Sequence, residues 1–329
     1  MATITDVANE AGVSLSTVSR VLNNNVFVSD EKRELVLKAM KKVGYQPSSK
    51  RVVKYNKNKV ILVVTSILLD SVISGIEEAA SDLGYIVLIE YIGLGSDGYA
   101  RCSETLKTLR NSLCGVILVN VVSRDENIPR LFGDIPVVQI GEYYELNPTY
   151  VVLTDDEKAS YDITKHVIGT GKNRIAYVST SSASSTYIHF AQQRLAGYRR
   201  ALLDSGIQPD DSLVYKTDLS IEGGREAARY FTSLPQPPDA ICCITDLMAV
   251  GCISELKKLK MQIPEQIAVA GFDNLEYTEV FSPSITTISQ NFDEMGAQAV
   301  DTLDRIIQGR LTKGQTIYIS HELIEREST

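Results

Sequence analysis

The sequence predicts an α/β protein in which a small N-terminal unit of helices precedes a larger body of doubly wound parallel sheets. Within the first 47 residues, three stretches place apolar side chains at helical spacing. From Val60 onward, short runs rich in Val and Ile alternate with longer stretches of helical periodicity. Strands this apolar are usually buried on both faces, and about 270 residues suffice for two lobes. The predicted strands are 60–64, 86–89, 116–119, 137–140, 175–178, 240–244 and 267–270.

Two short helices joined by a tight turn are predicted near the start of the chain. Thr5 is placed to cap the first helix, and Gly12 supplies the backbone freedom that ends it. Ser14 is placed to cap the second helix. The apolar side chains expected to pack between the helices are Val7, Ala8, Ala11, Val18, Val21 and Leu22. This pattern is a helix-turn-helix, although a surface helical hairpin with no nucleic-acid role would share it.

The second helix of this pair leaves side chains outward that suit the major groove of DNA. Small hydroxyl groups can approach phosphates and base edges, Arg20 can make two hydrogen bonds to a guanine, and Leu15 can contact a thymine methyl group. The outward residues are Leu15, Ser16, Thr17, Ser19 and Arg20.

A third helix is predicted over Asp30 to Val43, capped by Ser29 and ended at Gly44, with Leu35, Val36 and Met40 as its buried stripe. The charge of this region supports DNA binding. Residues 1 to 59 carry 11 Lys or Arg and 5 Asp or Glu, whereas the whole chain has a net charge of −8. A basic module on an acidic body is typical of a DNA-binding unit attached to a ligand-sensing domain.

Several motifs, in order along the chain, resemble those of the lactose repressor and galactose repressor (LacI/GalR) family. They are Ala-Thr-Ile-Thr-Asp-Val-Ala at 2–8, Val-Ser-Leu-Ser-Thr-Val-Ser-Arg-Val-Leu-Asn at 13–23, Val-Ser-Asp-Glu-Lys-Arg at 28–33, Gly-Tyr-Gln-Pro at 44–47, Arg-Leu-Ala-Gly-Tyr at 194–198, Asp-Leu-Met-Ala-Val-Gly at 246–251, Gly-Phe-Asp-Asn at 271–274 and Ser-Ile-Thr-Thr-Ile at 284–288. The resemblance implies that Leu15, Ser16 and Arg20 read bases. It implies phosphate contacts for Thr3, Ser14, Ser19 and Asn23.

The same resemblance implies the domain organisation. Residues 1–47 would form the DNA-binding headpiece, 48–59 a hinge or linker, and 60–329 a body that binds an effector and dimerises. The body would resemble periplasmic sugar-binding proteins, with two lobes crossed by three connections. The first lobe would take about 60–159 and 289–320, and the second about 160–288 and 321–329.

Polar side chains beyond the carboxyl ends of parallel strands are the candidates for effector binding. An Arg and carboxylates in a cleft can hold the adjacent hydroxyl groups of a sugar or ribose. The candidates are Arg194, Leu219, Thr245, Asp246, Asp273, Gln290 and Phe292, most of them placed by the resemblance. Asp246 has a second interpretation, because it directly precedes a helical run and could be its N-cap.

Two segments depart from the family pattern. The segment from Val64 to Gly75 lacks the Asn-Pro or Asp-Pro and the aromatic residues that help relatives to grip their effector. The hinge lacks the usual leucine wedge; Val52 or Val53 beside Arg51 could act as an apolar wedge in the minor groove, or the segment could be a flexible basic linker. A weak hinge and Leu-Pro-Gln-Pro-Pro at 234–238 resemble the cytidine repressor branch, so a nucleoside joins a sugar as a candidate effector.

The remaining features favour neither a metal site nor an enzyme. The five cysteines lack metal-ligand spacing and are expected to be buried, reduced thiols. The three histidines accompany no nucleophile motif, and the glycines form no P-loop or dinucleotide fingerprint. We therefore expect no catalytic residue, metal or cofactor. Without a signal peptide or a membrane-length apolar run, a cytoplasmic protein is expected, on the nucleoid when bound to DNA.

Together these observations predict a bacterial transcriptional repressor that binds a pseudo-palindromic operator as a homodimer and responds to a small-molecule effector in the cleft between its lobes. Since no leucine heptads follow the last strand-like run, a dimer is expected in preference to a tetramer. Two alternatives stay open: the same architecture controlled by a partner protein, and a cytoplasmic enzyme or carrier with an incidental helical hairpin.

Overall fold

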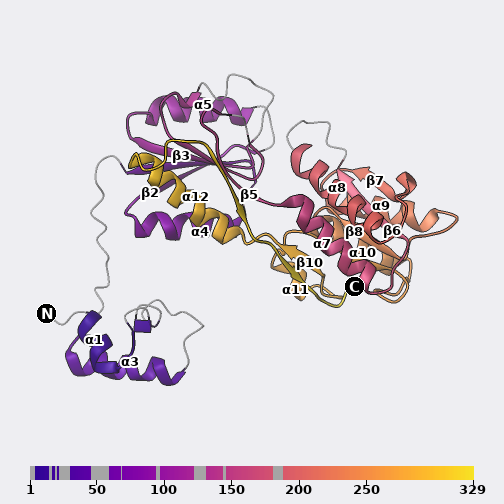
Figure 1. Cartoon of the computed structure of the whole chain (residues 1–329), viewed down its shortest axis with the longest axis horizontal. Helices are drawn as coiled ribbons and strands as arrows, with labels where there is room; N and C mark the ends of the chain where they lie inside the picture. The colour runs from indigo at the N-terminus through magenta and orange to yellow at the C-terminus, as the bar shows by residue number, and fades with distance from the viewer. Residues whose placement is uncertain are drawn as a thin grey trace. The chain divides into compact units, whose positions relative to one another are not determined.

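The computed structural model of the chain (Figure 1) describes residues 4–14, 17–18, 21, 30–45, 59–67, 69–93, 97–121, 131–143, 146–180 and 188–329. The chain divides into two compact units, Met1–Lys54 and Tyr55–Thr329. In the part of the chain that is described, no helix is both long and apolar enough to cross a membrane.

The first unit contains α1 (Ile4–Ala11) and α3 (Asp30–Val43), with helical backbone at residues 17, 18 and 21 between them. Gly12 ends α1 as predicted, with a φ of +64° and the amide of Val13 donating to the carbonyl of Ala8 at 3.1 Å. The cap predicted at Thr5 is wrong, because α1 begins at Ile4 and Thr5 lies inside it.

The predicted cap of the second helix is confirmed. Ser14 Oγ accepts a hydrogen bond from the amide of Thr17 at 3.2 Å, and the two hydroxyl oxygens lie 2.8 Å apart. The shared core of this unit contains Val7, Ala8, Val18, Val21, Val36 and Ala39. The stripe predicted for the third helix is wrong at Leu35, which is half exposed, because α3 turns Val36, Ala39 and Met40 inward instead.

The second unit begins with a six-stranded sheet in the order β11-β5-β4-β3-β1-β2, in which every neighbouring pair is parallel. Its strands are β1 (Val60–Thr65), β2 (Ile86–Tyr91), β3 (Leu113–Val119), β4 (Val137–Ile140), β5 (Tyr150–Thr154) and β11 (Gln315–Ile319).

Helices cover both faces of this sheet, as the unbroken apolar runs of its strands require. On one face, Ile61 and Ile117 pack against α4 (Asp70–Asp82) and α12 (Phe292–Ile307). On the other face, Leu62 and Leu118 pack against α5 (Asp97–Leu109). The strands therefore divide alternate side chains between two cores.

A second, four-stranded parallel sheet in the order β7-β6-β8-β9 forms the centre of the other lobe. Helices α7 and α8 pack together, as do α9 and α10. Because crossovers between parallel strands are right-handed, the strand order puts α8 on the face of the sheet opposite α9 and α10. The elements are α7 (Asp156–Gly169), β6 (Ile175–Thr180), α8 (Ile188–Asp204), η2 (Asp211–Leu213), β7 (Val214–Thr217), α9 (Ile221–Ser233), β8 (Ala240–Cys243), α10 (Asp246–Lys258), β9 (Ala268–Ala270) and α11 (Tyr277–Val280).

Three connections cross between the lobes. They run from β5 to α7, from β10 (Thr287–Ser289) to α12, and from β11 to β12 (Glu322–Ile324). Strands β10 and β12 pair antiparallel, and isolated parallel bridges join Ala270 to Thr286 and Asp273 to Ser289, so this pair lies beside β9. All seven predicted strands are present, and β5, β7, β10, β11 and β12 complete the sheets.

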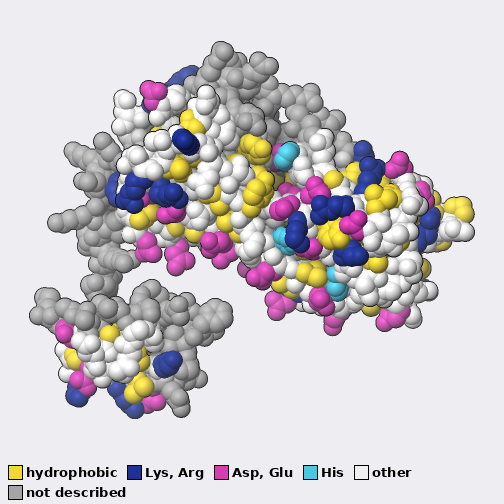
Figure 2. Space-filling model, in the orientation of Figure 1, with side chains coloured by type: hydrophobic (Ala, Val, Ile, Leu, Met, Phe, Trp, Pro, Cys, Tyr) yellow, Lys and Arg dark blue, Asp and Glu magenta, His cyan; other side chains and the backbone are white. Residues whose placement is uncertain are grey.

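The surface of the body is acidic in part, as the charge distribution predicted. Figure 2 shows Asp and Glu side chains in a row along the margin where Figure 1 draws α4, whose exposed members include Glu77, Glu78 and Asp82.

The helix pairs approach one another so closely that glycine is required at the contact. A Cβ on Gly197 of α8 would lie 2.0 Å from the carbonyl oxygen of Glu157 on α7. In the first lobe, a Cβ on Gly75 of α4 would lie 2.0 Å from the carbonyl oxygen of Asp293 on α12. In both places the obstacle is backbone, which cannot move aside as a flexible side chain would.

We expect Gly197→Ala to lower the free energy of unfolding by about 1–3 kcal/mol, because the added methyl group must push α7 and α8 apart. Gly169→Ala is the matched control: nothing lies within 4 Å of the added Cβ in the last turn of α7, and the expected change is a gain of at most about 1 kcal/mol. Chemical denaturation followed by circular dichroism measures both. Equal effects of the two substitutions would contradict the packing argument.

Candidate functional site

A cavity of about 340 Å³ lies between the two lobes, at the carboxyl ends of their parallel strands. The first lobe contributes the residues that follow β3, β4 and β5, and the second contributes residues from α8 and from the ends of β8 and β9. This is the position at which open α/β sheets bind ligands.

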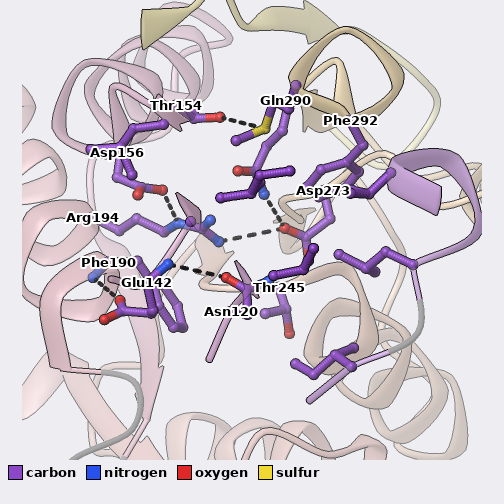
Figure 3. A pocket seen from close by; sticks show the side chains of 18 of the residues that line it. Asn120, Glu142, Thr154, Asp156, Phe190, Arg194, Thr245, Asp273, Gln290 and Phe292 are labelled. Carbon is purple, nitrogen blue, oxygen red and sulfur yellow. Dashed lines mark hydrogen bonds and ion pairs between the residues drawn. The ribbon is translucent and has the colours of Figure 1, made fainter. Parts of the chain in front are cut away.

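The structure brings six of the seven candidate effector residues to this cavity. They are Arg194, Leu219, Thr245, Asp273, Gln290 and Phe292. Although they lie up to almost one hundred positions apart in the sequence, the crossovers and the strand ends converge on one place, which Figure 3 shows from close by.

Asp246 is the exception: it does not line the cavity, and the prediction that it is the N-cap of the following helix is wrong. Its side chain is fully buried outside the lining of the cavity, where its carboxylate accepts hydrogen bonds from Thr287 Oγ1 at 2.6 Å and the amide of Leu275 at 2.9 Å. The N-cap of α10 is Thr245, whose hydroxyl oxygen accepts from the amide of Met248 at 3.4 Å. Asp246 therefore positions the loop after β9, while its sequence neighbours Thr245 and Leu247 line the cavity.

Arg194 is the central polar group of the cavity. Its side chain is only 5 % exposed, with Nε 2.7 Å from Asp156 Oδ1 and Nη1 3.6 Å from Asp273 Oδ1. Nη1 also donates to the carbonyl of Ile244 at 2.6 Å, and the guanidinium lies 3.5 Å from the centre of the Phe272 ring. A buried guanidinium is thus held by two carboxylates, a carbonyl and an aromatic face.

Asp273 follows β9 with a φ of +118°, a backbone conformation that side chains rarely adopt. Its Oδ1 accepts a hydrogen bond from Gln290 Nε2 at 2.7 Å (Figure 3), which ties the second lobe to the β10–α12 crossover. Burial raises the pKa of Asp273 to about 7, against the lowering effect of Arg194 and with a further raising effect of Asp246. Burial likewise raises the pKa of Asp156, although Arg194 opposes it.

Glu142 provides a polar link between the lobes. It follows β4 in the first lobe, is buried, and accepts a hydrogen bond from the amide of Phe190 near the N-terminus of α8 at 2.8 Å. Burial raises the pKa of Glu142, while the amide of Phe190 lowers it. The exposed amides of a helix N-terminus stabilise a carboxylate at this position.

Asn120 holds Glu142 in place. It directly follows β3 with a φ of +51°, and its Oδ1 accepts from the amide of Glu142 at 3.2 Å. Gly141, the residue directly before Glu142, has a φ of +73°, and a Cβ there would lie 2.1 Å from Asn120 Oδ1. Glycine is needed because the Asn120 side chain occupies that space.

Sequence reasoning missed several polar residues of the lining. They are Asn120, Glu142, Thr154, Asp155, Asp156, His189, Gln193 and Tyr318. A signal was present for Asn120 and Glu142, because each lies within two residues of the end of a predicted strand. The rest of the wall is largely apolar, from Ile67, Leu69, Val72, Leu219, Leu247, Leu275, Phe292 and Met295 among others.

Comparison with known proteins accounts for this architecture. The model of bacterial regulatory proteins of the lacI family matches residues 3–48, and that of a periplasmic binding protein-like domain matches residues 164–329. The HTH-type transcriptional repressor CytR of Escherichia coli K12 is 32 % identical over 100 % of this chain and 96 % of its own length. The chain belongs to the LacI family of bacterial regulatory proteins. The HTH-type transcriptional regulator DegA of Bacillus subtilis is 30 % identical, over 99 % of this chain and 98 % of DegA.

Solved structures agree with this assignment to the LacI family. A complex of the transcriptional regulator CelR with cellobiose has a TM-score of 0.74 at 27 % identity and covers 100 % of both chains. The lac repressor dimer bound to operator and the anti-inducer ONPF has a TM-score of 0.70 at 25 % identity, over 99 % of this chain and 98 % of that one. The relatives named here are transcriptional regulators.

Only two of the eleven predicted DNA-binding residues of this LacI-family chain fall within the described residues. Ser14 is exposed and Thr17 half-buried, and both lie at the start of the second helix. Thr3, Leu15, Ser16, Ser19, Arg20, Asn23, Arg51, Val52 and Val53 lie outside the described residues, and so does the hinge segment 48–58.

Burial of the thiols agrees with the expectation at four of the five cysteines. All five cysteines are free; four are buried, and Cys114 is half-buried. Among the residues that the structure describes, no group of three His, Cys, Asp or Glu side chains could hold a metal ion.

The raised pKa of Asp273 makes stability dependent on pH. Since its folded-state pKa of about 7 exceeds the ordinary 3.8, the protonated carboxyl favours the folded state; this contribution is full below about pH 4 and is lost as pH rises through about 7. We therefore expect Asp273→Asn to gain free energy of unfolding relative to the wild type between about pH 5 and about pH 7.5.

Urea denaturation at the two pH values measures this difference. Asp301→Asn, on the exposed face of α12, is the control and should track the wild type at both. An unchanged difference between the two proteins at about pH 5 and about pH 7.5 would show that Asp273 is already ionised in the folded state at about pH 5.

Proposed function

We propose that this LacI-family protein is a transcriptional repressor that binds a pseudo-palindromic operator as a homodimer. In this proposal residues 1–47 bind DNA, 48–59 form the hinge, and 60–329 bind the effector and dimerise, with the lobe boundaries given above. A small molecule in the cavity between the lobes controls DNA binding. The effector is a sugar, with a nucleoside as the second candidate.

The match of residues 3–48 to the DNA-binding model of the family is the observation that carries this proposal. The Ser14 cap and the shared core of α1, the second helix and α3 are consistent with a helix-turn-helix that presents a recognition helix. In this proposal Leu15, Ser16 and Arg20 contact bases. Thr3, Ser14, Ser19 and Asn23 contact phosphates, Thr17 also faces the DNA, and Arg51, Val52 and Val53 contact the minor groove.

Exposed apolar side chains on the first lobe support dimerisation. Strand β2 is the edge of its sheet, and Leu88, Ile89 and Tyr91 on it are 39 %, 48 % and 51 % exposed. An apolar edge strand is normally covered by a partner. A second copy of the chain is the natural occupant, because two recognition helices are needed to read both halves of a pseudo-palindrome. The lac repressor structure is itself that of a dimer.

The position of the cavity supports control by a ligand. Both lobes contribute to its lining, so a molecule bound there has different contacts in open and closed arrangements of the lobes. That difference limits the coupling to DNA binding, commonly to about 1–3 kcal/mol. A largely apolar cavity with convergent polar groups favours a small molecule over a partner protein as the controlling ligand. Because the operator lies on the bacterial chromosome, we propose the cytoplasm as the site of action.

Binding of the purified protein to the DNA that flanks its own gene tests the proposal. We expect tight binding that weakens steeply as salt rises, since Lys and Arg contacts to phosphates release counterions. Arg20→Ala should lose most of the preference for this DNA over random DNA, about 1–3 kcal/mol for a base contact made through two hydrogen bonds.

Lys38→Ala is the matched control, because Lys38 is exposed on α3 and paired with Glu34 at 2.7 Å. It should bind as the wild type does. If the wild type and Arg20→Ala bind the flanking DNA and random DNA equally, this assignment of the recognition helix is wrong.

A further inference from the structure

We propose that the cavity takes a hydroxyl-bearing effector that is uncharged or carries an amine, and that it rejects the phosphorylated and carboxylated counterparts of that effector. This inference rests on the proposed function, since it names the class of ligand that the cleft accepts. It is carried by the distribution of charge in the lining.

Acidic groups outnumber basic groups in the described part of the lining. The carboxylates are Glu142, Asp155, Asp156 and Asp273, and the basic side chains are Arg194 and His189. His189 is exposed, with its ring 5.9 Å from that of Tyr143. Arg194 is therefore the one buried cation among these described lining residues, whereas three of the carboxylates are buried or half-buried.

The charge of Arg194 is already balanced by the protein. Its guanidinium contacts Asp156 at 2.7 Å and Asp273 at 3.6 Å, and it donates to the carbonyl of Ile244. A phosphate or carboxylate on a ligand would have to compete with both carboxylates for this guanidinium. Displacing either one would leave a buried carboxylate without its partner, which is strongly unfavourable.

The carboxylates also raise one another's pKa values. Asp156 raises the pKa of both Asp273 and Glu142, and Asp246 behind the wall raises that of Asp273 further. Another negative charge in the same cavity would add to this repulsion. A ligand hydroxyl or amine does the opposite, because it donates hydrogen bonds to carboxylate oxygens.

Glu142 is the carboxylate best placed to select an amine. It comes from the first lobe, whereas Arg194 comes from the second, and among the residues that the structure describes no Lys or Arg side chain pairs with it. The amide of Phe190 takes one lone pair of Oε1, and a carboxylate offers about four such sites. Figure 3 shows Glu142 beside Phe190 at the margin of the labelled polar groups.

The apolar wall fits the same class of ligand. Leu69, Phe292 and Met295 line the cavity from the first lobe, and Leu247 and Leu275 line it from the second. These side chains can cover the apolar face of a sugar ring or a base, but they offer no hydrogen bond to a phosphate. The cavity thus combines carboxylate acceptors with an apolar face.

Matched sets of small molecules test this inference: glucose, glucosamine and glucose 6-phosphate, and adenosine, 2′-amino-2′-deoxyadenosine and AMP. Thermal unfolding of the full chain is measured with each compound over a concentration series, since binding to the folded state raises the midpoint. We expect stabilisation by uncharged or amine-bearing members, and an affinity about tenfold or more lower for the phosphorylated member.

Glu142→Gln is the decisive variant, because the amide oxygen of Gln still accepts from Phe190 while the charge is lost. It should reduce the ratio of amine to uncharged affinity by about tenfold and relax the rejection of phosphate. Glu157→Gln removes a carboxylate from α7 that does not line the cavity and should leave both ratios unchanged.

Binding of a phosphorylated member as tight as that of its uncharged counterpart overturns the inference. So does the absence of stabilisation by every member. Operator binding, measured on the same preparations, separates these failures from a failure of the proposed function: a chain that binds its operator but prefers anions is still a repressor, with a different effector.

Discussion

The buried ion pair network around Arg194 is the interaction on which the rest of the body depends. It joins Asp156, the first residue after the β5 crossover, to Asp273 after β9, and Gln290 extends it to the second crossover. A buried Arg194 without its carboxylates would be costly, and Asp156 and Asp273 offset that cost. The network therefore fixes the position of two of the three connections between the lobes, and with them the walls of the cavity.

Much of the fold could be predicted from the sequence, because its signals are local. The runs of Val and Ile identified seven strands, and Gly12, Ser14 and Gly44 identified the ends of short helices. The prediction that failed at Leu35 concerned which face of a helix is buried. That choice depends on the partners, here α1 and the second helix, more than on the periodicity of α3 alone.

The site was harder to predict because its residues meet only in three dimensions. The family resemblance supplied Arg194 and Asp273, but it could not show that Asp246 turns its carboxylate away toward Thr287. Glu142 was missed because its role depends on the N-terminus of α8, nearly fifty residues later in the chain. Such contacts between lobes leave no periodic signal in the sequence.

The crossovers have a consequence for how such a regulator evolves. Asp155 and Asp156 on the first connection, Gln290 on the second and Tyr318 beside the third all line the cavity. In the proposed function, a molecule bound there would contact these connections, so a substitution that tunes its affinity would also alter how freely the lobes move relative to each other. Recognition of the effector and the response to it would then depend on the same residues. Substitutions in the apolar wall, away from the connections between the lobes, would change specificity with the least effect on the response.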